Sequence, residues 1–280
     1  MRGRASLTAL AVATARALAG VDPYAHMFLP AWLSERVHDA SADKRRRAIE
    51  WLSLGLVTHI KHRTIAIDEA LAEAVARGVS QVVILGAGLD TRAYRLHELA
   101  TAVVYEVDHP ATQREKLQGA HLMRSAARML KHVAVDFERD SLEHALEAAG
   151  HRAALPTAWI WEGVTMYLAP EAVLATLRVI EARSTSSSRL MMTYATDGLF
   201  QVPLVGPFLA RAALAAVGEP LRATYPPDEV CAMLRRHHFD VAWDGYPSDW
   251  PSDWPTNEPS GLPLRLIQER IAVADRTAGG

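Results

Sequence analysis

From about residue 81 onward, the chain alternates between short, continuously apolar runs and longer amphipathic stretches. Such runs are typical of parallel strands buried on both faces, and the stretches between them are typical of helices. The expected strands are 82–85, 103–108, 133–136, 158–161, 189–194, 239–243 and 264–274. The expected helices between them include 109–130, 141–149, 170–182 and 228–237. This alternation predicts an α/β fold, with a mostly parallel, seven-stranded sheet covered by helices on both sides.

The first 75 residues have a helical pattern instead. Leu7, Leu10 and Leu18 fall on one helical face, and Arg16 interrupts this apolar stretch. Two arginines before the stretch give it some resemblance to a signal peptide, but the interruption favours an amphipathic helix of a cytoplasmic protein. We therefore expect an N-terminal helical cap over residues 1–75 and a larger domain over 76–280.

Two further segments interrupt the strand–helix alternation. Residues 199–226 form an apolar insert, which we expect to be a helical cap over the carboxyl edge of the sheet. The sequence Ser-Asp-Trp-Pro occurs twice in tandem at 248–255, and its proline density predicts an irregular surface loop. Trp250 and Trp254 of this loop either help to line a pocket or fold onto the surface.

Composition narrows the classes of function. Half of the 280 residues are apolar and 22% are charged, enough apolar residues for a sizeable core. Lys and Arg total 30 against 32 Asp and Glu, so no net positive charge favours nucleic acid as a partner. The single cysteine, Cys231, excludes an intramolecular disulfide and a multi-cysteine metal site. No apolar run is long enough for a membrane span, and neither a metal site nor an oligomeric state is indicated.

The strongest chemical signal follows the first expected strand, where the chain reads Gly86-Ala87-Gly88-Leu89-Asp90. Glycines in such a turn let a ligand approach the backbone closely, at the sheet edge where α/β proteins bind ligands. Asp108 ends the next strand, 20 residues after Gly88. This spacing suits a carboxylate that accepts hydrogen bonds from ribose hydroxyls. The pattern therefore predicts a ligand that contains adenosine.

The same turn argues against a dinucleotide. A dinucleotide fingerprint needs a third small residue near position 91, where a helix packs beside the pyrophosphate. This chain has Thr91 there, and Asp90 would place a negative charge beside the phosphates. S-adenosylmethionine has no phosphates and ends in a cationic amino acid, so it fits better. A nicotinamide-dependent oxidoreductase and a non-catalytic protein with this fold remain the alternatives.

Several stretches together resemble a known family. They are 81–96, 105–110 and 162–168, with Arg63, Thr64 and Asp68 upstream. In them the chain is similar to the leucine carboxyl methyltransferase family of class I methyltransferases, and most to its bacterial branch of small-molecule and polyketide O-methyltransferases. The likeness runs from about Ser6 to the C-terminus and weakens after Thr196. It implies a Rossmann-like fold with S-adenosylmethionine as cofactor.

The resemblance also implies roles for single residues. Arg63 would grip the carboxylate of the methionine moiety, as a planar guanidinium can, although an ion pair with Asp68 is an alternative. The other cofactor-binding residues would be Gly86, Ala87, Gly88 and Asp90 in the turn, Asp108 at the ribose, Asp136 and Phe137 beside the adenine, and Glu162 near the amino group. Glu106 would support the end of its strand.

One departure from the family pattern concerns the acceptor. Members that methylate a protein C-terminal leucine tend to read Asp-Leu-Arg at the third strand, whereas this chain reads Asp136-Phe137-Glu138. The missing arginine could have met a substrate carboxylate. The departure therefore favours a small-molecule acceptor over a protein C-terminus.

The chemistry itself needs little from the protein, because the leaving group of methyl transfer is neutral. A carboxylate acceptor is already ionised at neutral pH, whereas a hydroxyl benefits from a base. We expect Tyr167 to orient the acceptor oxygen and His59 to be the candidate base, with structural roles as the alternative for both. The predicted function is O-methylation of a carboxylate or hydroxyl on a small, hydrophobic metabolite, and we expect that metabolite to belong to secondary metabolism.

Overall fold

The computed structural model describes residues 7–39, 55–121, 123–137, 139–200, 220–252 and 267–277. Within them, seven strands form one sheet in the order β3-β2-β1-β4-β5-β7-β6. The strands are β1 (Gln81–Leu85), β2 (Val103–Asp108), β3 (Met129–Ala134), β4 (Thr157–Trp161), β5 (Arg189–Phe200), β6 (Phe239–Gly245) and β7 (Ile267–Arg276). All neighbours pair in parallel except β7, which is antiparallel to β5 and β6. This confirms the predicted mostly parallel, seven-stranded sheet.

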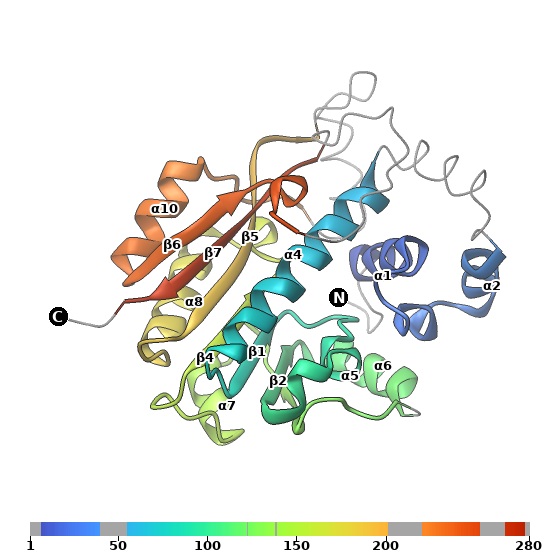
Figure 1. The fold of residues 1–280 in the computed structure, drawn as a ribbon, viewed down its shortest axis with the longest axis horizontal. Helices are drawn as coiled ribbons and strands as arrows, with labels where there is room; N and C mark the ends of the chain where they lie inside the picture. The colour runs from blue at the N-terminus through green and yellow to red at the C-terminus, as the bar shows by residue number, and fades with distance from the viewer. Residues whose placement is uncertain are drawn as a thin grey trace.

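Helices cover both faces of the sheet. The α-helices are α1 (Leu7–Ala19), α2 (Ala31–Asp39), α4 (Leu56–Ala76), α5 (Arg92–Arg95), α6 (Pro110–Ala120), α7 (Leu142–Ala148), α8 (Pro170–Ala182) and α10 (Pro227–Arg236). The short 3₁₀ turns are η1 (Ala25–Phe28), η2 (His97–Thr101), η3 (Thr165–Tyr167) and η4 (Pro247–Asp249). Figure 1 shows the long helix α4 crossing in front of the strands, with α8 and α10 on the opposite side.

The alternation of side chains along each strand explains these layers. In β1, Val83 and Leu85 face a core shared with α7, α8 and α10, whereas Val82 and Ile84 face a second core with α4. Both sets are fully or almost fully buried, as the continuous apolar run predicts for a central parallel strand. The helix α4 falls within the expected N-terminal cap, yet its apolar face packs on the sheet.

Helix α1 and the turn after it lie over the turn that follows β1. Ala13 of α1 packs with Leu89, and the buried carboxylate of Asp22 accepts a hydrogen bond from Thr91 Oγ1 at 2.6 Å. Asp22 also accepts hydrogen bonds from the backbone N–H groups of two residues in the following turn. These contacts fix α1 beside the carboxyl ends of the strands (Figure 1).

Three element boundaries differ clearly from the sequence-based prediction: the end of α6, the start of β3 and the end of β5. The strand β3 begins at Met129, in the region expected to be the end of a helix, and α6 already ends at Ala120. β3 is an edge strand whose first residues are exposed or half-buried, so it lacks a continuous apolar run. β5 continues to Phe200, so the first residues of the expected insert belong to the sheet.

The rest of the insert is described only from residue 220. Residues 220–226 form neither a helix nor a strand, and the Tyr225 N–H donates to the Ala195 carbonyl oxygen. The segment 201–219 lies outside the described residues. Among the described helices, none combines the length and the hydropathy that a membrane span needs.

The first copy of the tandem repeat folds onto the surface of α4. Trp250 donates from Nε1 to Glu69 at 2.7 Å and packs edge-on against Trp243, with ring centroids 4.9 Å apart. Ser252 also donates to Glu69, at 2.6 Å. Two alternatives were open for Trp250, lining a pocket or folding onto the surface, and its contacts with Glu69 and Trp243 match the second. Trp254 lies outside the described residues.

A buried ion pair between β2 and α6 provides a test of the fold. Glu106 Oε2 lies 2.7 Å from Lys116 Nζ, and both side chains are at most 2% exposed. Lys116→Met should lower the free energy of unfolding by about 3 kcal/mol, because it leaves a buried carboxylate whose remaining basic neighbour among the described residues is His132 Nδ1, at 3.3 Å. The double variant Glu106→Leu with Lys116→Met should recover to within about 1 kcal/mol of the original chain. Urea unfolding measures both values, and a double variant no better than the single one would contradict the pairing.

Candidate functional site

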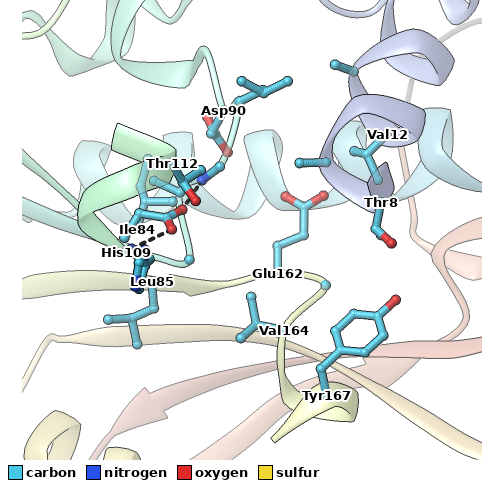
Figure 2. A pocket seen from close by; sticks show the side chains of 18 of the residues that line it. Thr8, Val12, Ile84, Leu85, Asp90, His109, Thr112, Glu162, Val164 and Tyr167 are labelled. Atoms are coloured by element: carbon cyan, nitrogen blue, oxygen red, sulfur yellow. Dashed lines mark hydrogen bonds between the residues drawn. The ribbon is translucent and has the colours of Figure 1, made fainter. Parts of the chain in front are cut away.

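A cavity of about 290 Å³ lies at the carboxyl ends of β1, β2 and β4 (Figure 2). In the sheet, β2 and β4 are the two neighbours of β1: the chain passes from β1 outward to β2 and β3, and then returns to β4 on the other edge of β1. Ligands of open α/β sheets bind where the strand order reverses in this way. The lining residues come from α1, α4, the turn after β1, the ends of β2 and β4, and η3. They include Thr8, Val12, Arg16, Arg63, Gly86, Ala87, Gly88, Asp90, Asp108, His109, Phe137, Glu162, Gly163 and Tyr167.

The floor of the cavity is the glycine turn. Gly86 has a φ of +67°, and a Cβ built on it would lie 2.5 Å from Val164 Cγ2. Gly88 has a φ of +45°. The N–H groups of Gly86 and Ala87 both donate to the carbonyl oxygen of Val107, which joins the turn to β2. Only glycine fits position 86, because both the backbone angle and the space exclude a side chain.

Asp108 lies beside this turn. Its carboxylate accepts hydrogen bonds from the backbone N–H groups of Gly88 and His109. Burial raises the pKa of the Asp108 carboxyl, and the two N–H groups offset part of that increase. A carboxylate held by backbone donors at a cavity wall can still accept hydrogen bonds from a ligand with its remaining lone pairs.

Glu162, directly after β4, is surrounded by three arginines from three helices. Its Oε1 accepts hydrogen bonds from Arg16 Nη2 of α1 at 2.7 Å and from Arg63 Nε of α4 at 2.8 Å. Its Oε2 accepts one from Arg92 Nη1 of α5 at 2.7 Å. Burial alone would raise the pKa of Glu162, but the three guanidinium groups outweigh it and hold the pKa well below its ordinary value.

The network extends beneath the glycine turn. Asp90 accepts hydrogen bonds from the Arg92 backbone N–H, at 2.7 Å, and from the Arg92 side chain. Asp68 accepts from Arg92 Nε at 2.6 Å and is paired with Arg95 at the same distance. Burial raises the pKa of Asp90, but Arg92 and Arg16 more than compensate, so that the pKa is lowered. Asp68 therefore pairs with Arg92 and Arg95, and the alternative ion pair between Asp68 and Arg63 is wrong.

Arg63 has a second carboxylate partner, Glu269 of β7. Arg63 Nη1 lies 3.1 Å from Glu269 Oε1 and 2.8 Å from Oε2. His59 Nε2 lies 2.7 Å from the same Oε2, and all three side chains are buried. Burial raises the pKa of Glu269, but Arg63 and His59 outweigh burial and lower it to about 2.

The structure brings most of the predicted site residues into this one cavity. Those that line it are Arg63, Gly86, Ala87, Gly88, Asp90, Asp108, Phe137, Glu162 and Tyr167. His59 is not among the lining residues. It is buried, and its Nε2 contacts Glu269, which does not line the cavity either. Asp136 does not line the cavity either. Its carboxylate lies 4.0 Å from His109 Nε2, and His109 does line it.

Several residues at or beside the cavity were not predicted as site residues, among them Thr8 and Arg16 of α1 and Glu269 of β7. Thr8 and Arg16 lie on one face of α1, with Val12 between them at intervals of four residues. A cation inside an apolar helical face was a usable signal for Arg16, because such a charge needs a buried partner. Glu269 occupies an inward position of β7 between Ile267 and Ile271, which is likewise an unusual place for a carboxylate.

The side of the cavity near η3 differs in character from the side near β2. In Figure 2, the hydroxyl of Tyr167 points toward Thr8, while His109 and Thr112 lie across the cavity. Val12 and Val164 add apolar surface near Tyr167 and Thr8.

Within the described parts of the chain, no cluster of His, Cys, Asp and Glu side chains has a geometry that could hold a metal ion.

Comparison with known sequences relates the chain to methyltransferases. The family model described as leucine carboxyl methyltransferase matches residues 3–181. A Streptomyces coelicolor protein whose name describes an S-adenosyl-L-methionine-dependent methyltransferase is 36% identical over 247 residues, which cover 84% of this chain and 83% of the relative. A Mycobacterium avium protein described in the same way is 41% identical over 198 residues, covering 65% of this chain and 62% of the relative.

Solved structures show the same fold at much lower identity. A DUF574 family protein from Streptomyces avermitilis superposes with a TM-score of 0.65 at 17% identity, covering 98% of this chain and 99% of the other. A protein from Thermobifida fusca, whose title calls it a methyltransferase, gives a TM-score of 0.63 at 18% identity, covering 99% and 97%. At this identity the likeness concerns the fold alone.

The lowered pKa of Glu162 predicts how stability depends on pH. Because the folded-state pKa lies well below the unfolded value of 4.5, the charged carboxylate stabilises the fold above about pH 4.5, and this contribution falls as the pH drops toward the folded pKa. Glu162→Gln should therefore cost about 3 kcal/mol or more in unfolding free energy near neutral pH. The deficit should shrink by about 2 kcal/mol at about pH 3. Urea unfolding at both pH values measures it, with the exposed Asp240→Asn as control, and a deficit independent of pH would contradict the account.

Proposed function

The chain belongs to the leucine carboxyl methyltransferase family, and on that premise we propose that it transfers a methyl group to an oxygen atom of a small, hydrophobic metabolite. It is an S-adenosylmethionine-dependent methyltransferase. One observation carries the proposal: a single cavity is lined by Asp108, Phe137, Arg63 and the glycine turn. Asp108 suits a ribose, Phe137 an adenine and Arg63 a carboxylate, and the glycine turn lets a ligand approach the protein backbone closely.

The charges around the cavity fit this cofactor. Among the described residues, the buried network that borders it contains the four arginines 16, 63, 92 and 95 and the five carboxylates 22, 68, 90, 162 and 269. Asp108 adds a further carboxylate at the cavity wall, so carboxylates outnumber guanidinium groups there and a cationic ligand is favoured. S-adenosylmethionine has one net positive charge, from its sulfonium, ammonium and carboxylate groups. A dinucleotide would add negative charge beside Asp90, which supports the methyl donor over a nicotinamide cofactor.

In this mechanism the residues of the chain mainly bind and orient. When bound, S-adenosylmethionine would supply a sulfonium methyl group, to which an acceptor oxygen could bond as the neutral thioether leaves. Asp108 would hold the ribose and Arg63 the carboxylate, which would set the direction of the methyl group relative to the rest of the cavity. Tyr167 and Thr8 present hydroxyl groups that can orient the acceptor oxygen. The apolar surface of α1 excludes water there, and positioning of this kind can supply most of a methyl-transfer rate.

The surroundings of Tyr167 favour a carboxylate as the methyl acceptor. Among the described carboxylates and histidines there, none is placed to act as a base. Among the described lining residues on that side, Glu162 is the only carboxylate, and both of its oxygens accept hydrogen bonds from arginines. His109 lies across the cavity and accepts the Ala111 N–H with Nδ1 (Figure 2). A carboxylate acceptor is ionised at neutral pH and needs no base, whereas an alcohol would need one.

Two other functions have less support. Methylation of a protein C-terminal leucine is disfavoured by Glu138, which stands where members with that activity tend to have an arginine. A non-catalytic role is disfavoured by the retention of Arg63, Asp108 and Glu162, all at the cavity. The apolar lining supports a polyketide-like or similarly hydrophobic acid as the acceptor.

Calorimetric titration tests cofactor binding. S-adenosylmethionine and S-adenosylhomocysteine should both bind, and Asp108→Asn should weaken both by about 10- to 100-fold, because it removes a charged acceptor. Binding should also weaken in acid at a pH above the ordinary carboxyl range, since burial raises the pKa of Asp108 and its protonation removes that acceptor. The exposed Asp240→Asn is the control. No binding by the folded chain would contradict the proposal.

The chemistry of the product tests the acceptor. With a radiolabelled methyl donor and a panel of hydrophobic carboxylic acids paired with the corresponding alcohols and phenols, we expect transfer to the acids. The product should release labelled methanol in mild alkali, because esters hydrolyse there and ethers do not. A base-stable product from the phenols would contradict the carboxylate assignment while leaving the methyltransferase activity in place.

A further inference from the structure

The guanidinium of Arg63 is held at two of its three nitrogens. Nε donates to Glu162 at 2.8 Å, and Nη1 lies between the two oxygens of Glu269. Because a guanidinium is planar and rigid, two anchored nitrogens fix the direction of the third. Nη2 makes no hydrogen bond with the described residues. It lies beside Gly163, where a Cβ added to the glycine would be 3.8 Å from Nη2, and both residues line the cavity.

Glu269 reaches this position from the far end of the chain. It lies on β7, 206 residues after Arg63, and beyond the region that the family model matches. Its side chain is 3% exposed and does not line the cavity. His59, one turn before Arg63 on α4, holds Glu269 Oε2 from the other side. The carboxylate is thus fixed by α4 itself and can act on a ligand only through Arg63.

We propose that Glu269 is the positioning residue of the methionine end of the cofactor site, holding Arg63 so that Nη2 faces the ligand carboxylate. This inference rests on the proposed function, since it assumes that Arg63 receives that carboxylate. Glu269→Gln would replace the two charged acceptors of Arg63 Nη1 with one neutral amide oxygen. The ion pair with Glu162 would then be the stronger anchor of Arg63, so the guanidinium plane could rotate about its Nε contact.

Two ligands separate this role from a merely structural one. S-adenosylhomocysteine carries the amino-acid carboxylate, whereas 5′-methylthioadenosine has the same nucleoside and thioether without it. For Glu269→Gln, the affinity for S-adenosylhomocysteine should fall by about tenfold or more, as for loss of a charged hydrogen bond, while the affinity for 5′-methylthioadenosine stays within about twofold. Calorimetry measures both affinities, and thermal unfolding measures folding.

The matched control is Asp275→Asn. Asp275 lies on the same strand and accepts two hydrogen bonds from Arg189, at 2.7 and 2.9 Å, but neither residue borders the cavity. This variant removes a carboxylate charge from another arginine pair on the same strand, at a more exposed position away from the cavity, so the affinities for both ligands should remain unchanged. Equal weakening of the two ligands by Glu269→Gln, or no weakening of either, would overturn the proposal.

A second variant covers the case in which Glu269→Gln does not fold. Glu269→Asp keeps the charge but shortens the side chain by one methylene, so that Arg63 must shift or lose a contact. It should show the same selective loss for S-adenosylhomocysteine, with a smaller magnitude, and a loss shared equally by both ligands would again overturn the proposal. Failure of the original chain to bind either ligand would instead contradict the proposed function.

Discussion

The site depends on one buried carboxylate, Glu162, which accepts hydrogen bonds from arginines of three separate helices. Burying a charge is costly unless it is paired and its lone pairs are satisfied. Arg16, Arg63 and Arg92 satisfy both oxygens of Glu162, and Glu162 in turn makes burial of the three arginines possible. The constraint is mutual, so α1, α4 and α5 are all held at the end of β4, around the same cavity.

This arrangement explains why the cavity is better suited to positioning than to proton transfer. The carboxylates that face it are occupied: Glu162 by arginines, Asp90 by Arg92, and Asp108 by two backbone N–H groups. Asp108 keeps lone pairs for a ribose, whereas Glu162 mainly fixes the geometry of its partners. A methyl donor with a neutral leaving group and an acceptor that is already ionised need such a site, in which placement and the exclusion of water do most of the work.

The sequence predicted those parts of the site that depend on local pattern. A strand, a glycine turn and an acid at the end of the next strand are close in sequence, so Gly86, Gly88 and Asp108 could be placed before the fold was known. The start of β3 could not, because an edge strand with Lys131 and His132 in its interior lacks the apolar run of a buried strand. Glu269 and Arg16 are distant in sequence from their partners, by 206 and 146 residues, and no local pattern reports such pairings. For the same reason His59 was predicted as a base from its place near Arg63, whereas its partner is the distant Glu269.

A crystal structure of the chain with bound S-adenosylhomocysteine tests the central claim most directly. The account predicts that the ribose hydroxyls lie on Asp108, the adenine beside Phe137, and the ligand carboxylate on Arg63, with the three arginines still bound to Glu162. A ligand seated elsewhere on the chain, or in the same cavity with its amino-acid end turned away from Arg63, would contradict it.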